Sequence, residues 1–172
     1  MNEGDPMRLV LLIIAMMLTP QAVLAGARAC APPALPQMVG SLAAETNALR
    51  AARGHDALRL DGRLSQAAQR HACDIARRAV VTHRDAAGRR PLARVKRAGF
   101  RACFTAENVA MGSPDPGRTV QAWQASTGHA RNQHDPRARS MGFGVARDAD
   151  GRLWWVALYA SACEKVSRRA RW

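Results

Sequence analysis

The chain has 172 residues, with 26 basic and 13 acidic side chains and a formal net charge of +13. This length is enough for one domain with a buried core and too short for two ordinary ones. The charge favours anionic partners, although a compositional bias toward arginine would give the same excess. We expect no nucleic-acid partner, because the arginines are scattered and no aromatic side chains lie among them for base stacking.

The N-terminus has the plan of a secretory signal peptide. A basic residue precedes an unbroken apolar run, Leu9–Leu18, and Pro20 follows it. The run is too short to span a bilayer, and small residues up to Ala25 offer a cleavage site. We therefore expect residues 1–25 to be removed and the protein to be exported, to the periplasm or the extracellular space. An uncleaved anchor is the alternative.

Four cysteines are present, and an even number in an exported chain indicates two disulfides. Three pairings are possible. We expect a nested arrangement, in which Cys30 joins Cys163 and Cys73 joins Cys103. Each bridge would then stabilise the fold by about 3–5 kcal/mol through loop entropy. A lipid anchor on Cys30 is the alternative, which the preceding arginine, Arg28, disfavours.

The first predicted elements are two helices. After a proline-rich lead-in over residues 26–38, apolar spacing predicts a helix over residues 39–53, with Gly54 ending it. Asp61 predicts the N-cap of a second helix. The apolar stripe of this helix recurs at three- and four-residue spacing and comprises Leu64, Ala67, Ala68, His71, Ile75 and Ala76.

Shorter elements follow, and together they predict an α+β domain in which helices cover an antiparallel sheet. Asp115 and Pro116 form a cap and first turn for a helix through Trp123. We expect Trp123 to anchor the core with Phe143, Trp154 and Trp155. The other predicted elements are a short basic helix over Arg90–Ala98, an extended segment over Phe104–Met111, and a β-hairpin of Met141–Ala146 and Leu153–Ala160.

Three side chains suited to chemistry stand out: His83, Glu107 and His129. Glu107 interrupts an apolar strand, where an ionised carboxylate is costly unless something compensates it. A cation, a histidinium or a metal-bound water is the natural partner. Two imidazoles with a carboxylate nearby can hold zinc and leave coordination positions open for water. Taken singly, each histidine is more often structural.

Short motifs follow one another in order along most of the chain. The main ones are Asn47-Ala48-Leu49-Arg50, Leu58-Arg59-Leu60-Asp61, Leu64-Ser65-Gln66-Ala67-Ala68, His83, Ala106-Glu107-Asn108-Val109-Ala110, Ser126-Thr127-Gly128-His129 and Met141-Gly142-Phe143-Gly144. This series resembles bacterial CAP domains, the superfamily of cysteine-rich secretory proteins, antigen 5 and pathogenesis-related 1 proteins. We therefore predict a CAP domain over residues 39–163, with a basic tail over residues 164–172.

The resemblance implies a three-layer α-β-α sandwich with a central antiparallel sheet and a cleft where two histidines and two glutamates meet. By this likeness His83 and His129 can bind a divalent metal such as zinc, with Glu107 beside it and Asn108 and Ser126 lining the cleft. No organic cofactor is expected. The second glutamate is missing, since residues 123–128 contain no acid.

These observations favour an exported binding module in which Glu107 orients a metal-bound water. Its ligand would be an anionic envelope component or, by analogy with relatives, a lipid. A metal-dependent hydrolase with Glu107 as general base is the alternative, and an inert scaffold is a third interpretation. A monomer is expected for so small a domain.

The remaining histidines have less specific interpretations. We expect His55 to lie in a surface loop and His71 to be a core or boundary residue of the second helix. His134 is interpreted as a solvated loop residue, with a role as an added metal ligand as the alternative.

Overall fold

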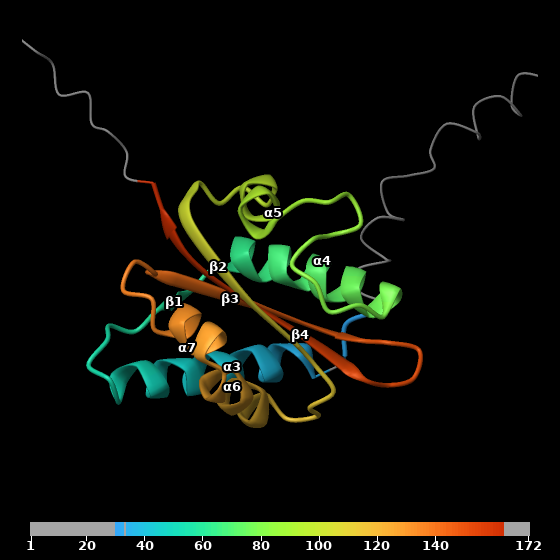
Figure 1. The fold of residues 1–172 in the computed structure, drawn as a ribbon, viewed down its shortest axis with the longest axis horizontal. Helices are drawn as coiled ribbons and strands as arrows, with labels where there is room; N and C mark the ends of the chain where they lie inside the picture. Colours follow the sequence, from blue (N-terminus) through green and yellow to red (C-terminus); the bar gives the residue numbers. More distant parts are fainter. Residues whose placement is uncertain (1–29, 33, 164–172) are drawn as a thin grey trace, which may run out of the picture.

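The structure is a computed structural model that describes residues 30–32 and 34–163, so the expected signal peptide and basic tail lie outside the described residues. No helix in the described part is both long and apolar enough to cross a membrane. Element labels follow Figure 1. The helices are α3 (Leu35–Ala51), α4 (Gly62–Arg78), α5 (Pro91–Arg97), α6 (Pro116–Ala125) and α7 (Thr127–Gln133), and the strands are β1 (Arg59–Leu60), β2 (Ala102–Met111), β3 (Ser140–Arg147) and β4 (Leu153–Ala162).

The four strands form one sheet in the order β1-β3-β4-β2. Strands β2, β3 and β4 pair antiparallel, while the short β1 runs parallel to β3. Helices α4 and α5 lie on one side of the sheet, and α3, α6 and α7 lie on the other (Figure 1). The predicted α-β-α sandwich is confirmed, with β1 as one parallel addition to its antiparallel sheet.

Strand β4 is buried on both faces because it lies at the centre of the sandwich. Trp154, Val156 and Leu158 belong to the core between the sheet and α4, whereas the alternate residues Trp155 and Tyr159 belong to the core on the α3 side. Strand geometry sends successive side chains to opposite faces, which explains this division. The four predicted core anchors are confirmed as at most 1% exposed: Trp123, Phe143, Trp154 and Trp155.

Helix α4 lies directly on β3 because β3 has glycine where it faces the helix. A Cβ added to Gly142 would lie 2.3 Å from the backbone nitrogen of Ser65. A Cβ added to Gly144 would lie 2.3 Å from the carbonyl carbon of Ala68. The side chain of Gln69 bonds the nitrogen and oxygen of Val145 at 2.9 and 2.8 Å. The helix backbone therefore occupies the space that side chains would fill elsewhere.

The predicted helix starts are confirmed in two cases and shifted in a third. The Asp61 carboxylate accepts hydrogen bonds from the first turn of α4, and Asp115 does the same for α6. Helix α3 begins at Leu35 rather than at residue 39. Pro36 lies in its first turn, where the missing N–H costs nothing.

The nested disulfide pairing is wrong. Cys30 joins Cys73, with Cα atoms 5.7 Å apart, and Cys103 joins Cys163 at 4.8 Å. The reason is the topology, which chain order alone does not reveal. Strand β2 pairs along β4, so Ala102 lies opposite Ala162 and the neighbouring cysteines meet at that end of the sheet.

Two polar side chains of α3 tie distant segments to the layer that contains α7. The Asn47 amide bonds the backbone nitrogen and oxygen of Leu58 at 2.9 and 3.1 Å. The buried Arg50 guanidinium donates to the carbonyl oxygens of Gln133, at 2.7 Å, and Asp135, at 3.4 Å. A cation suits this position because carbonyls at a helix C-terminus are partially negative. Arg50 thus fixes the end of α7.

Candidate functional site

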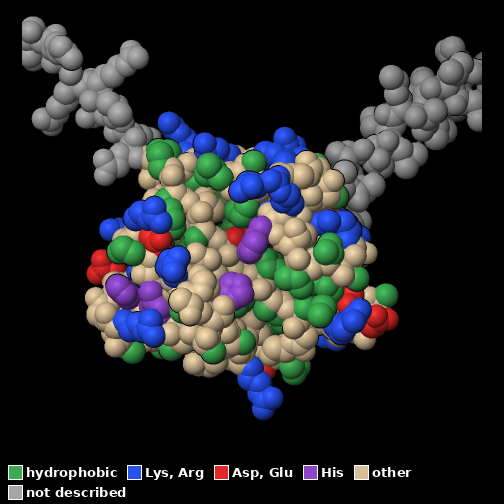
Figure 2. Space-filling view, in the orientation of Figure 1, with side chains coloured by type: hydrophobic (Ala, Val, Ile, Leu, Met, Phe, Trp, Pro, Cys, Tyr) green, Lys and Arg blue, Asp and Glu red, His purple; other side chains and the backbone are tan. Residues whose placement is uncertain are grey.

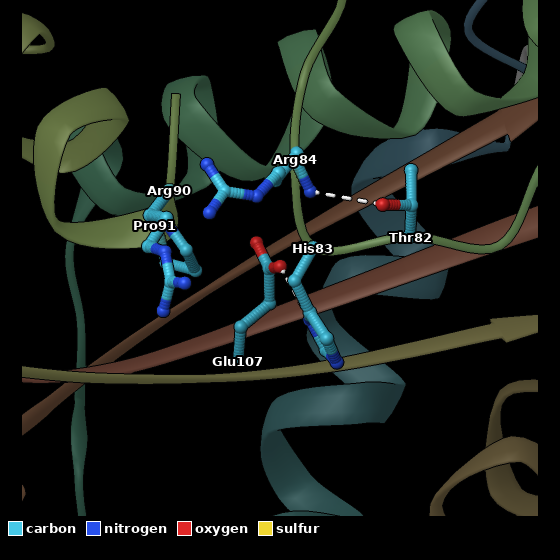
Figure 3. Close-up of a pocket in the computed structure, with 6 residues that line it drawn as sticks. All are labelled: Thr82, His83, Arg84, Arg90, Pro91 and Glu107. Atoms are coloured by element: carbon cyan, nitrogen blue, oxygen red, sulfur yellow. Dashed lines mark hydrogen bonds and ion pairs between the residues drawn. The ribbon is translucent and has the colours of Figure 1, made fainter. Parts of the chain in front are cut away.

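The predicted site residues come from three parts of the chain that meet beside β2. His83 lies in the loop after α4, Glu107 lies on β2 and His129 lies on α7. His83 and Glu107 line a cavity of about 530 Å³. The other lining residues, drawn in Figure 3, are Thr82, Arg84, Arg90 and Pro91.

Glu107 is buried with both carboxylate oxygens engaged. Its Oε1 accepts a hydrogen bond from Nδ1 of His83 at 2.9 Å, and its Oε2 accepts one from the Arg94 guanidinium. The Glu107 side chain is 1% exposed. The imidazole of His71 lies behind it, with Nε2 3.7 Å from Oε1. The cation expected beside this carboxylate is therefore Arg94, with His83 as the second partner.

Arg94 was not predicted as a site residue, although it connects three parts of the site. It lies on α5 and is almost fully buried. Besides Glu107, its guanidinium donates to the carbonyl oxygens of His83, at 2.9 Å, and Arg89, at 2.7 Å. One arginine thus holds both the carboxylate and the loop that carries His83. In the sequence it was one of several arginines in a short basic helix, which gave no signal of this role.

His83 faces the cavity with one ring nitrogen committed to Glu107. The carboxylate accepts a hydrogen bond from Nδ1, and this bond raises the pKa of His83 above its ordinary value. A neutral His83 that donates from Nδ1 presents Nε2 as a lone pair. The His83 side chain is 56% exposed. Figure 3 shows its ring turned so that the second nitrogen points away from Glu107.

His129 is half-buried on α7, and burial together with the nearby charge of His83 lowers its pKa. Two asparagines dock α7 onto β2. The Asn108 amide donates to the carbonyl oxygen of His129 at 3.1 Å. The Asn132 amide donates to the Asn108 side chain at 2.9 Å and to the carbonyl oxygen of Glu107 at 3.1 Å. The backbones that carry Glu107 and His129 are thereby linked.

Asn108 was a predicted site residue, and it contributes by joining β2 to α7. Asn132 belongs to the same network; it was part of the family resemblance but was not predicted as a site residue. Ser126 lies at the junction of α6 and α7, where its carbonyl oxygen accepts from Ala130 at 2.8 Å. Its side chain makes no capping hydrogen bond. A role for Ser126 in the cleft stays a prediction.

Two of the remaining histidines lie as predicted, and one does not. His71 is buried in α4 and its Nε2 donates to the carbonyl oxygen of Thr82 at 2.8 Å, while burial lowers its pKa. His55 lies half-buried in the loop after α3. The interpretation of His134 as solvated is wrong, because it is 8% exposed and bonds Gln124 at 2.8 Å. Burial, followed by nearby positive charge, lowers its pKa to about 4.

The described residues contain no group of three or more His, Cys, Asp or Glu arranged to hold a metal ion. Of the two predicted ligands, His83 lies in the wall of the cavity, and His129 lies on α7, outside the set of described residues that line it. Glu107 lies behind His83, bonded to its Nδ1. In many metal sites a carboxylate that does not itself bind the metal orients a ligand histidine by such a hydrogen bond. The contact with Glu107 thus gives His83 the fixed orientation that a metal ligand needs, and metal binding by His83 and His129 stays a prediction.

The chain matches the CAP family, described as the cysteine-rich secretory protein family, over residues 43–159, and it belongs to this family. It is also 29% identical over 109 residues to YkwD of Bacillus subtilis (strain 168), an uncharacterized protein. That alignment covers 63% of this chain and 42% of YkwD, so the chain spans less than half of the curated relative. The expected CAP membership is confirmed.

Solved structures share the fold. An outer surface protein from Borrelia burgdorferi matches with a TM-score of 0.66 and 23% identity, over 71% of this chain and 90% of that one. An extracellular protein with an SCP domain from Bacillus anthracis matches with a TM-score of 0.66 and 19% identity, over 73% and 40%. A cysteine-rich secretory protein from Staphylococcus aureus has a TM-score of 0.58 and 19% identity, over 73% and 38%. At these identities the likeness establishes the fold.

Proposed function

We propose that this CAP-domain protein is an exported binding module that holds a divalent metal ion, zinc being the candidate, through His83 at the cavity wall and His129 on α7. The observation that carries the proposal is the bonded series Arg94, Glu107 and His83. A buried arginine fixes a buried carboxylate, and the carboxylate fixes an imidazole at the wall of a cavity. Such an arrangement orients a histidine for a ligand.

Each residue has a distinct part in this proposal. His83 and His129 would hold the ion, which would supply positive charge for an anionic or polar ligand in the cavity. Glu107 sets the orientation of His83 by accepting its Nδ1 proton in a hydrogen bond. Arg94 keeps Glu107 in place and joins it to the His83 backbone. The original expectation that Glu107 orients a water is thus replaced by a role in orienting His83.

A hydrolase is less well supported. A general base must be free to accept a proton from the attacking group. Both oxygens of Glu107 already accept hydrogen bonds from side chains of the fold. The cysteines are also paired in disulfides and are not available as nucleophiles. We therefore favour binding over catalysis.

Export is supported by the two disulfides, since such bonds persist in oxidising compartments. Two of the structural relatives are described as an outer surface protein and an extracellular protein. The expected signal peptide lies outside the described residues, and sequencing the N-terminus of the exported protein would test it. A start at Gly26 is the predicted result.

Zinc titration of protein purified without a histidine tag tests the site. We expect His83→Ala and His129→Ala each to weaken zinc binding strongly, and Glu107→Gln to weaken it about 10- to 100-fold by releasing His83. His55→Ala is the matched control, a histidine in the loop after α3, and should bind zinc as the wild type does. Equal zinc affinity in the wild type and both ligand variants would refute the proposal.

Assays with casein, esters and cell-wall fragments separate binding from hydrolysis. The binding proposal predicts no turnover that depends on Glu107. Activity that disappears in Glu107→Gln while the circular dichroism spectrum stays native would favour the hydrolase instead.

A further inference from the structure

The charges around the cavity do not balance. Glu107 is the acid among the six described residues that line it. Its negative charge is already offset by Arg94, and His83 hydrogen-bonds its other carboxylate oxygen. Arg84 and Arg90 line the same cavity, and neither has a carboxylate partner among the described residues. The cavity therefore offers positive charge that the protein itself leaves unmatched.

Arg84 is held in place by its own loop. Its backbone nitrogen donates to the Thr82 hydroxyl at 3.1 Å, and its guanidinium donates to the carbonyl oxygen of Gly88 at 2.9 Å. Arg78 donates to the Arg84 carbonyl oxygen at 2.9 Å. A guanidinium has five N–H donors, so one bond to Gly88 leaves others for a ligand. Arg84 is thus positioned before any ligand arrives.

Arg90 reaches the cavity from the start of α5. It precedes Pro91, which restricts the backbone of the residue before it to extended conformations. Figure 3 shows Arg84 and Arg90 on the side of Glu107 opposite to the His83 ring. Figure 2 shows lysine and arginine side chains gathered over the upper part of this face, with histidines lower down. Arg84 and Arg90 therefore supply positive charge on the side of the cavity opposite His83.

Two smaller hollows also contain arginines, and each is lined by at least one aspartate as well. The hollows have volumes of about 270 and 60 Å³, and Asp85 lies in both. Asp85 pairs with Arg89 at 2.7 Å, and Asp74, in the larger hollow, pairs with Arg78 at 2.7 Å. Each of these hollows therefore has an aspartate in its wall that would repel an anion. The large cavity has the greater volume, and no aspartate is among the described residues that line it.

We propose that Arg84 and Arg90 bind the anionic group, phosphate or carboxylate, of the ligand that enters this cavity. Guanidinium groups form paired, charge-assisted hydrogen bonds with both kinds of anion. The volume of about 530 Å³ exceeds what one such group fills, so the rest of the ligand extends toward His83. The inference rests on the proposed function in using the same cavity, but it requires no metal ion.

Calorimetric titration with glycerol 3-phosphate and with acetate, both in the presence of EDTA, tests the proposal. The test variant is Arg84→Gln with Arg90→Gln. The control is Arg59→Gln with Arg118→Gln, which removes the same net charge at two exposed arginines away from the cavity. We expect the test variant to bind at least about tenfold more weakly than the wild type. The control should change affinity by less than about twofold.

Vesicles identify the source of the anion. Binding to mixed phosphatidylcholine and phosphatidylglycerol vesicles that is lost in the test variant would place the anionic group on a lipid. Binding to glycerol 3-phosphate but not to vesicles would place it on a soluble molecule or polymer. Either result supports the proposal.

Three results would overturn it: no binding of either soluble probe or of vesicles, wild-type affinity in the test variant, or an equal loss in the control. The last would mean that net charge alone attracts the anion. None of these results affects the zinc titration. Likewise, a zinc titration that refutes the metal site would leave anion binding in EDTA unchanged. The failure of one proposal can therefore be told apart from the failure of the other.

Discussion

The contact of α4 with β3 and the edge of the sheet at β2 are built on opposite principles. At the first, Gly142 and Gly144 let a helix backbone touch the sheet, and small apolar residues fill the interface. At the second, Glu107, Arg94 and Asn132 bring charge and amide groups together from β2, α5 and α7. Shape decides the first region and electrostatic pairing decides the second. The closely packed α4–β3 contact thus supports the polar residues at the β2 edge of the same sheet.

The largest effect is expected where shape decides. Gly144→Ala places a Cβ 2.3 Å from two backbone atoms of α4, so the helix must move off the sheet. We expect a loss of about 4–5 kcal/mol in the free energy of unfolding, the range of severe core substitutions. Urea denaturation followed by circular dichroism measures it.

Gly40→Ala is the matched control. Gly40 lies within α3, and an added Cβ meets nothing within 4 Å. Alanine is the better helix former, so this variant should gain about 0.5–1 kcal/mol. Equal effects of the two substitutions would contradict the assignment of α4 to the glycine face of β3.

The next effect concerns the Arg94–Glu107 ion pair at the β2 edge of the sheet. Arg94→Gln leaves the buried Glu107 carboxylate without its main cation, which should cost about 3–4 kcal/mol in stability. Adding Glu107→Gln removes the uncompensated charge, so the double variant should recover part of the loss. Arg89→Gln, which breaks a more exposed pair with Asp85, should cost at most about 1 kcal/mol. Additive effects of the two substitutions in the Arg94–Glu107 pair would contradict their coupling.

His134 gives a smaller effect that depends on pH. Its pKa is lowered from 6.5 to about 4 in the folded protein, so the unfolded chain binds this proton first as the pH falls. The stability that a neutral His134 provides is complete above pH 6.5 and is lost between there and about pH 4. The loss should reach about 3 kcal/mol. His134→Gln should flatten this part of the stability curve, and an unchanged curve would contradict the burial of a neutral imidazole.

The sequence predicted well those features that depend on local pattern. Asp61 and Asp115 mark helix starts because short acids cap free backbone nitrogens, and the spacing from Leu64 to Ala76 gives the buried face of α4. Glycines in the Met141-Gly142-Phe143-Gly144 motif were part of the family resemblance. Their steric role became visible only when α4 was placed against them.

Features that depend on contacts between segments far apart in the sequence could not be predicted in the same way. The disulfide pairs follow from β2 lying beside β4, and chain order suggested a different pairing. Glu107 stood out because a charge in an apolar strand needs a partner. Arg94 did not stand out, because Glu107 lies on a different element and the sequence gives no sign that distinguishes this arginine from the others. His134 was misjudged for a similar reason, since its contacts are with Gln124 on α6 and with His55 in the loop after α3.

The central claim is that Glu107 serves to orient His83. A pH titration of the His83 imidazole by nitrogen-15 NMR tests it most directly. The hydrogen bond to Glu107 predicts a proton on Nδ1 and a pKa above the ordinary value of 6.5. In Glu107→Gln this pKa should fall back toward 6.5. A wild-type pKa at or below 6.5, or one that does not change in Glu107→Gln, would contradict the account.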